Sequence, residues 1–172
     1  MANIGEIAQL GATVLRLQAQ VVTHIQSAEI QQIIETMQDT LATTEGVGLA
    51  APQISISKRI IIIASSPTPR YPSAPFMEPT VMINPAFETL SDTKEKDWEG
   101  CLSIPGIRAL VPRYQEIKIN YTNQQGMLVE ARLEGFVAQV FQHEFDHLEG
   151  KVYLDRVEDN RDIFAESEYF KL

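Results

Sequence analysis

The sequence predicts an α+β fold in which mixed, mainly antiparallel sheets surround a central helix bearing an HExxH pattern, with a further helix near the N-terminus. Residues 27–43 have the apolar spacing of an amphipathic helix. Residues 116–133 alternate like the two strands of a hairpin, and residues 136–148 return to a helical period. Because helix, strands, hairpin and helix follow in that order, an α+β domain is favoured over repeated βαβ units.

The N-terminal helix is indicated by its cap and by its apolar face. Ser27 is a suitable N-cap because its hydroxyl can accept a hydrogen bond from a backbone N–H of the first turn. Glu29 places a negative charge in that turn, where the helix dipole favours it. One face of the helix carries the side chains expected to pack on the core: Ile30, Ile33, Ile34, Met37 and Leu41.

Two apolar runs predict buried strands with a loop between them. Residues 58–64 and 81–83 are β-branched or aliphatic and are bounded by turn-forming residues. Five of the nine prolines fall within residues 67–79. Because proline donates no backbone hydrogen bond and disfavours helix, this stretch is predicted to be an extended loop.

The hairpin and the last helix have clear boundaries. The first hairpin strand places alternate apolar residues on one face, residues 122–126 have turn composition, and residues 127–133 alternate again. Gly150 stands where a residue in the left-handed conformation would end the helix over residues 136–148.

Length and composition fit one ordinary globular domain. With about 150 residues expected per domain, the 172 residues predict a single catalytic domain over residues 1–172. Hydrophobic residues at 44% and charged residues at 22% are close to the averages of soluble proteins, so the composition does not support a disordered, collagen-like or coiled-coil class. The net charge of −9 argues against a protein that holds DNA or anionic lipid by a broad basic surface.

Three further features concern the compartment. The longest aliphatic run, residues 60–64, is far shorter than the roughly 20 residues that a membrane helix needs. The first residues lack the basic and then apolar segments of a secretory signal. The single cysteine, Cys101, cannot form an internal disulfide, which suits a reducing compartment. We therefore expect a cytoplasmic protein; an organelle matrix or stroma would require that a transit peptide had been removed.

The last helix contains the HExxH pattern and two of the three histidines. At about 100° per residue, His143 and His147 point within roughly 40° of each other, so both imidazoles can reach one metal ion. They continue the apolar stripe of Phe136 and Val140, and Glu144 lies beside them. Burying these polar groups without partners would be costly, and a divalent cation with a bound water supplies partners.

A catalytic metal needs a third protein ligand, for which there are three alternatives. Gly150 fits the glycine of a metzincin pattern, but Tyr153 occupies the place of its third histidine. Glu166 and Glu168 have the separation from His147 expected of a thermolysin-type ligand. Cys101 would bind a divalent ion strongly as a thiolate.

Three segments together resemble the motifs of the peptide deformylase family. They are residues 46–53 (GVGLAAPQ), 99–103 (EGCLS) and 142–147 (QHEFDH), in that order, and the resemblance extends from about Leu10 to Asp155. It implies a hydrolase that removes the N-formyl group from the N-terminal methionine of newly synthesised polypeptides and releases formate. The ligands it implies are Cys101, His143 and His147, holding one divalent ion, usually Fe²⁺, which Zn²⁺, Ni²⁺ or Co²⁺ can replace.

The residues of the last helix suit that chemistry. A metal-bound water has its pKa lowered toward 7 and can attack the formyl carbon, while Glu144 acts as general base and then as general acid toward the leaving amine. The developing oxyanion needs further donors. The resemblance assigns these to the backbone N–H of Leu102 and the side-chain amide of Gln53.

Substrate-binding residues are predicted around this centre. An extended segment at Val47 and Gly48 could pair with a peptide added as a strand, with Gly100 opposite, and the resemblance implies the same. Phe136 and Val140, together with Val47, are apolar positions suited to a methionine pocket.

The expected partners are N-formyl-methionyl peptides and nascent chains, with transient ribosome contact and neither DNA nor membrane. Residues 151–172 hold four basic and six acidic residues, which does not favour ribosome docking through a basic tail. Arg108 and Arg113 are candidates to anchor substrate or to pair with Glu99 or Asp146, although a solvated side chain is the commoner outcome.

Two other classes of function fit the same pattern. A HExxH endopeptidase would use Glu166 as third ligand and would not need Cys101. A non-catalytic, metal-stabilised binding module would keep the ligands and would not need Glu144.

Overall fold

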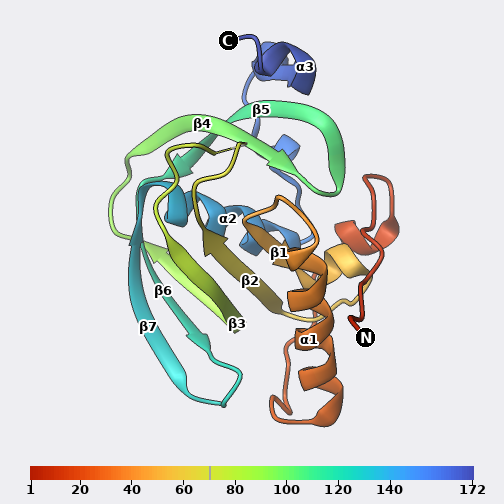
Figure 1. Ribbon diagram of the computed structural model, residues 1–172. Helices are drawn as coiled ribbons and strands as arrows, with labels where there is room; N and C mark the ends of the chain where they lie inside the picture. The colour runs from red at the N-terminus through yellow and green to blue at the C-terminus, as the bar shows by residue number, and fades with distance from the viewer. Residues whose placement is uncertain (70) are drawn as a thin grey trace.

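The computed structural model describes residues 1–69 and 71–172 (Figure 1). Its elements follow an α+β order, in which a long run of strands lies between an N-terminal helix and a later helix. The longer elements are α1 (Ala28–Ala42), β1 (Gly48–Ala50), β2 (Ile60–Ser65), β3 (Met77–Thr89), β4 (Lys94–Cys101), β5 (Ile104–Tyr114), β6 (Glu116–Thr122), β7 (Leu128–Glu134), α2 (Gly135–Leu148), β8 (Ile163–Ala165) and α3 (Glu166–Tyr169). Short 3₁₀ turns are η1 (Thr13–Arg16), η2 (Ala51–Ile54), η3 (Tyr153–Arg156) and η4 (Asn160–Asp162).

The strands form two antiparallel sheets. One sheet has five strands in the order β1-β2-β3-β6-β7, and the other has three in the order β4-β5-β8. In Figure 1 the β4 and β5 ribbons arch over the end of the larger sheet, and α3 lies beyond them. None of the helices in the described residues is long and apolar enough to cross a membrane.

The larger sheet is covered by a helix on each face. Ile61 and Ile63 of β2 belong to the same buried cluster as Phe141 of α2, whereas Ile60 and Ile62 belong to the cluster that includes α1. Side chains alternate between the two faces of a strand, so a strand buried on both faces reads as a continuous apolar run. This arrangement explains the unbroken isoleucines of β2 and fixes α2 against the sheet.

The predicted helices and hairpin are confirmed. Ser27 caps α1, accepting a hydrogen bond from the Ile30 backbone N–H at 3.3 Å. Strands β6 and β7 form an antiparallel pair in which Ile119 lies opposite Ala131. Gly150, just after α2, has φ of +70°, and a Cβ there would lie 2.7 Å from the Arg16 carbonyl oxygen, so glycine suits both its conformation and its surroundings.

The proline-rich loop is shorter than predicted. Strand β3 begins at Met77, so residues 77–79 are strand, and the predicted run 81–83 is only the middle of it. Pro79 is tolerated because the register between β2 and β3 shifts between Ile63 and Ser65. An irregularity of this kind is where a strand accommodates a residue that donates no hydrogen bond.

The smaller sheet was not predicted. Strand β4 is exposed over its first half and begins with charged residues, so it lacks the apolar alternation of a half-buried strand. Pairing with β5 holds it in place, from Lys94 opposite Tyr114 to Cys101 opposite Ile104. This pairing carries Cys101 into the interior, where it is 3% exposed.

Met37→Ala tests the packing of α1 on the sheet. Met37 is fully buried, so truncation should lower the free energy of unfolding by about 2–5 kcal/mol, measured by urea titration. Gln38 is exposed on the same helix, and Gln38→Ala should change it by no more than about 0.5 kcal/mol. Equal effects of the two substitutions would contradict this packing.

Candidate metal centre

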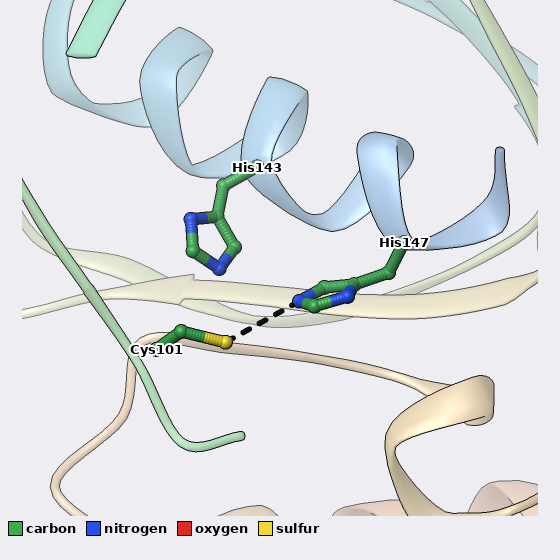
Figure 2. A group of neighbouring side chains, drawn as sticks. All are labelled: Cys101, His143 and His147. Atoms are coloured by element: carbon green, nitrogen blue, oxygen red, sulfur yellow. Dashed lines mark hydrogen bonds between the residues drawn. The ribbon is translucent and has the colours of Figure 1, made fainter. Parts of the chain in front are cut away.

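Three potential ligands converge in the interior. The ligand atoms of Cys101, His143 and His147 all lie within 4.8 Å of one another. The Cys101 Sγ atom is 3.5 Å from His147 Nε2. Figure 2 shows both imidazoles projecting from the same side of α2 toward the cysteine. One thiolate and two imidazoles at this spacing form a donor set suited to a divalent transition metal.

The local backbone explains how these side chains meet. The two histidines are four residues apart on α2 and therefore share a face of the helix. Cys101 ends β4, and the preceding Gly100 packs directly on Arg108. A Cβ on Gly100 would lie 2.9 Å from Arg108 Nε, so glycine allows this close approach.

Glu99 orients one of the ligands. Its Oε1 atom accepts a hydrogen bond from His143 Nδ1 at 2.7 Å, which directs Nε2 of the ring toward the other ligands. Arg113 donates to both carboxylate oxygens of Glu99, at 2.8 and 3.0 Å. The same arginine donates to Asp146 at 2.6 Å. His143 is thus fixed by a buried network of alternating charges.

The charges of this network shift the pKa values of its members. Burial opposes ionisation of Glu99, but Arg113 and His143 outweigh it and lower the pKa of the carboxyl to about 2. Burial likewise opposes ionisation of Cys101, yet His147 and His143 hold the pKa of the thiol well below its usual range. Burial disfavours the charged form of His143, but Cys101 and Glu99 raise its pKa well above the usual range.

The donor set therefore fits a divalent cation. The negative charges of Cys101 and Glu99 that hold a proton on His143 would equally attract a metal ion in its place. All three potential ligands are buried, and Cys101 and His143 also line a pocket from which substrate would reach a bound ion. With these three residues as ligands, a bound ion would keep a coordination position for water or substrate.

Glu144 is buried beside the potential ligands. It is 4% exposed, and its Oε2 atom has no hydrogen-bond partner among the described residues. Burial raises the pKa of this carboxyl to about 7, although His143 and His147 oppose the shift. A Cβ on Gly48 would collide with the Glu144 carboxylate, so glycine lets β1 approach it.

One pocket contains the residues predicted from the sequence. The predicted substrate-binding residues, catalytic residues and two of the three ligands line it together: Val47, Gly48, Gly100, Phe136, Val140, Gln53, Leu102, Glu144, Cys101 and His143. Sequence reasoning missed Tyr71 and Trp98, which also line this pocket. Each is a single aromatic residue outside the recognised motifs, so no pattern indicated a role.

Gln53 has a defined place in this pocket. Its amide nitrogen donates to Ser103 Oγ at 3.1 Å and lies 3.5 Å from Cys101 Sγ. Its amide oxygen accepts a hydrogen bond from the Ala50 backbone N–H at 3.0 Å. These bonds fix the side chain with its nitrogen directed toward the metal ligands.

The expectation of solvated arginines is wrong for both residues. Arg113 is 4% exposed and forms the predicted alternative pairs with Glu99 and Asp146. Arg108 is fully buried and pairs with Glu166 at 3.3 Å. Isolated arginines are usually solvated because burying a charge is costly, but tertiary pairing compensates at both positions.

The other proposed third ligands have different contacts. Glu166 bonds to Arg108, and Glu168 forms an ion pair with Lys171 at 2.7 Å. The Tyr153 hydroxyl donates to the Ile107 carbonyl at 3.2 Å. Among the described residues, the cluster of potential ligands contains Cys101 and neither glutamate.

Comparison with known proteins identifies relatives across most of the chain. A family model described as polypeptide deformylase matches residues 4–162. Peptide deformylase 2 of Nostoc sp. is 51% identical over 166 residues, which cover 96% of this chain and 93% of the relative.

Solved structures show the same similarity. The Met-Ala-Ser-bound class I type b peptide deformylase from Acinetobacter baumannii aligns with a TM-score of 0.88 and 41% identity, covering 91% of this chain and 100% of that chain. A peptide deformylase from Synechococcus elongatus in complex with actinonin aligns with a TM-score of 0.80 and 36% identity, covering 92% and 81% of the two chains.

Glu99→Gln tests the orientation of His143. The amide keeps the size of the side chain but removes the charge that holds the imidazole, so metal affinity should fall by about 10- to 100-fold, measured by competition with a chromogenic chelator. Glu95, exposed on the same strand, provides the control Glu95→Gln, which should bind metal as the wild type does. Unchanged affinity of Glu99→Gln would exclude this role.

Proposed function

The chain belongs to the polypeptide deformylase family, and on that premise we propose how its own residues perform the reaction. The enzyme removes the N-formyl group from the N-terminal methionine of newly synthesised polypeptides and releases formate. The observation that best supports the roles proposed below is the buried convergence of Cys101, His143 and His147 beside Glu144. Residues 1–172 would form one catalytic domain organised around the HExxH motif of α2.

Cys101, His143 and His147 would hold the metal ion on which the family depends. When bound, a divalent ion supplies Lewis acidity and lowers the pKa of a coordinated water. We assign Fe²⁺ as the usual ion because membership of the family implies it. Zn²⁺, Ni²⁺ or Co²⁺ would substitute, since a thiolate and two imidazoles suit all four ions. Glu99 would hold His143 in the orientation that the ion requires.

Glu144 is the proposed general base and acid. Its carboxylate is buried beside the ligands, and its pKa of about 7 lies near neutral pH. A buried carboxylate beside the metal-binding residues can accept a proton from the attacking water and return it to the leaving amine. The buried Oε2 atom is the acceptor we assign to that proton.

Two donors are proposed for the negative charge that develops on the formyl oxygen. The Gln53 amide nitrogen is held near Cys101 by its bond to Ser103. The Leu102 backbone N–H follows the ligand directly in the chain, and Leu102 lines the same pocket. Donors fixed before the reaction need no reorganisation when the charge appears.

The substrate would bind as an added strand between the two sheets. Strand β1 is an edge strand of the larger sheet, and β4 is an edge strand of the smaller sheet. Val47 and Gly48 lie at the first edge and Gly100 at the second, and all three line the pocket. Edge strands present backbone groups that an extended peptide can pair with.

The methionine side chain would occupy the apolar part of the pocket, against Phe136, Val140 and Val47. The substrates are N-formyl-methionyl peptides and nascent chains, which places the proposed activity in the cytoplasm or an organelle matrix where translation occurs. Transient ribosome contact would bring the enzyme to its substrate, and DNA and membranes are not proposed as partners.

Glu144→Gln tests the proposed base. Protein purified without oxygen and reloaded with ferrous iron should release formate from a formyl-methionyl tripeptide. The variant should keep its metal but lose at least about 100-fold in kcat because it can no longer accept the proton. Glu130→Gln, at an exposed position, is the control. Wild-type turnover by the metallated Glu144→Gln protein would refute the assignment and favour a metal-binding role alone.

Cys101→Ala tests the third ligand. The variant should retain no stoichiometric iron and no deformylase activity, measured by metal analysis after gel filtration and by formate release. An endopeptidase that used Glu166 as third ligand would survive this change. A fully metallated and active Cys101→Ala protein would therefore overturn the ligand assignment.

A further inference from the structure

Residues 163–170, named here the C-terminal strap, lie outside the part of the chain that matches the family model. The strap consists of β8, α3 and Phe170. Strand β8 adds to β5 by antiparallel pairing, with Phe164 opposite Arg108 and Ala165 opposite Ile107. In Figure 1, α3 lies above the β4 and β5 ribbons. The strap is thus attached to the sheet that supplies Cys101.

Trp98 connects the strap with the substrate pocket. It is a half-buried residue of β4 that lines the pocket. Its ring centroid lies 4.9 Å from that of Phe164 and 5.1 Å from that of Tyr169. Tilted and edge-to-face contacts at these distances are favourable. The two strap rings therefore hold one wall of the pocket in position.

Arg108 provides a second connection. Its guanidinium carbon lies 5.1 Å from the Tyr169 ring centroid and 5.9 Å from that of Phe170. The side chain is fully buried, and its Nη2 atom has no hydrogen-bond partner among the described residues. The aromatic rings therefore supply part of the compensation for burying the charge. Arg108 packs in turn on Gly100, which the proposed substrate strand would contact.

The position of Trp98 along β4 indicates which part of the peptide it faces. Trp98 precedes Cys101 by three residues, which is at most about 10 Å of strand because β4 is irregular between Glu99 and Cys101. A peptide pairing along β4 with its formyl group at Cys101 also advances by about 3.3 Å per residue. Its second and third residues would then lie level with Trp98, beyond the methionine pocket.

We propose that the C-terminal strap is a specificity-determining element, which fixes Trp98 and Arg108 and thereby favours peptides that extend beyond the second residue. This inference rests on the proposed binding of the substrate as a strand along β4. The strap residues themselves are positioning residues, because they act through Trp98 and Arg108.

Tyr169→Ala is the direct test, because Tyr169 contacts both Trp98 and Arg108. Formate release would be measured from formyl-Met-Ala and formyl-Met-Ala-Ser with the iron-loaded enzyme. The variant should lose about fivefold in kcat/KM for the tripeptide, through KM, and less than about twofold for the dipeptide. Tyr169→Phe keeps both ring contacts and should behave as wild type. A second variant, ending after Asp162, should reduce the preference for the tripeptide further.

The outcomes separate this inference from the proposed function. If the wild type releases formate from neither peptide, the proposed function fails. If the wild type is active and Tyr169→Ala loses the same factor on both peptides, or on neither, the strap does not determine specificity. The proposal is supported if Tyr169→Ala loses kcat/KM selectively on the tripeptide while Tyr169→Phe keeps the wild-type value. This result does not depend on whether the truncated chain folds.

Discussion

The contact between Cys101 and the two histidines of α2 is the constraint on which the rest of the structure depends. The ligand atoms lie within 4.8 Å of one another and come from a strand end and a helix distant in sequence. Such a cluster is costly to bury unless every charge has a partner. Glu99 and Arg113 provide partners on one side, and the proposed metal ion provides one on the other.

Each of the two sheets positions a different part of this cluster. The larger sheet is packed by α1 on one face and by α2 on the other, which fixes the histidines on a rigid element. The smaller sheet brings Cys101 and Glu99 to them from positions two residues apart on β4. Because both sheets end in an edge strand, the pocket at their junction presents backbone groups from each side. The C-terminal strap braces the smaller sheet where it borders this pocket.

Periodic segments and motifs were predictable from the sequence, whereas features set by tertiary pairing were not. Helix α1 and the β6–β7 hairpin follow from their apolar periods, and the ligand candidates follow from residue type and spacing. Strand β4 has no such period and exists because β5 pairs with it. The burial of Arg108 and the place of Trp98 in the pocket depend on segments far away in sequence, so no local pattern indicated them.

The most direct test of this account is X-ray absorption spectroscopy of the zinc-loaded protein at the absorption edge of zinc. A centre formed by Cys101, His143 and His147 predicts one sulfur at about 2.3 Å and two imidazole nitrogens at about 2.0–2.1 Å. A first shell without sulfur, or with a single imidazole, would contradict the ligand set and the mechanism built on it.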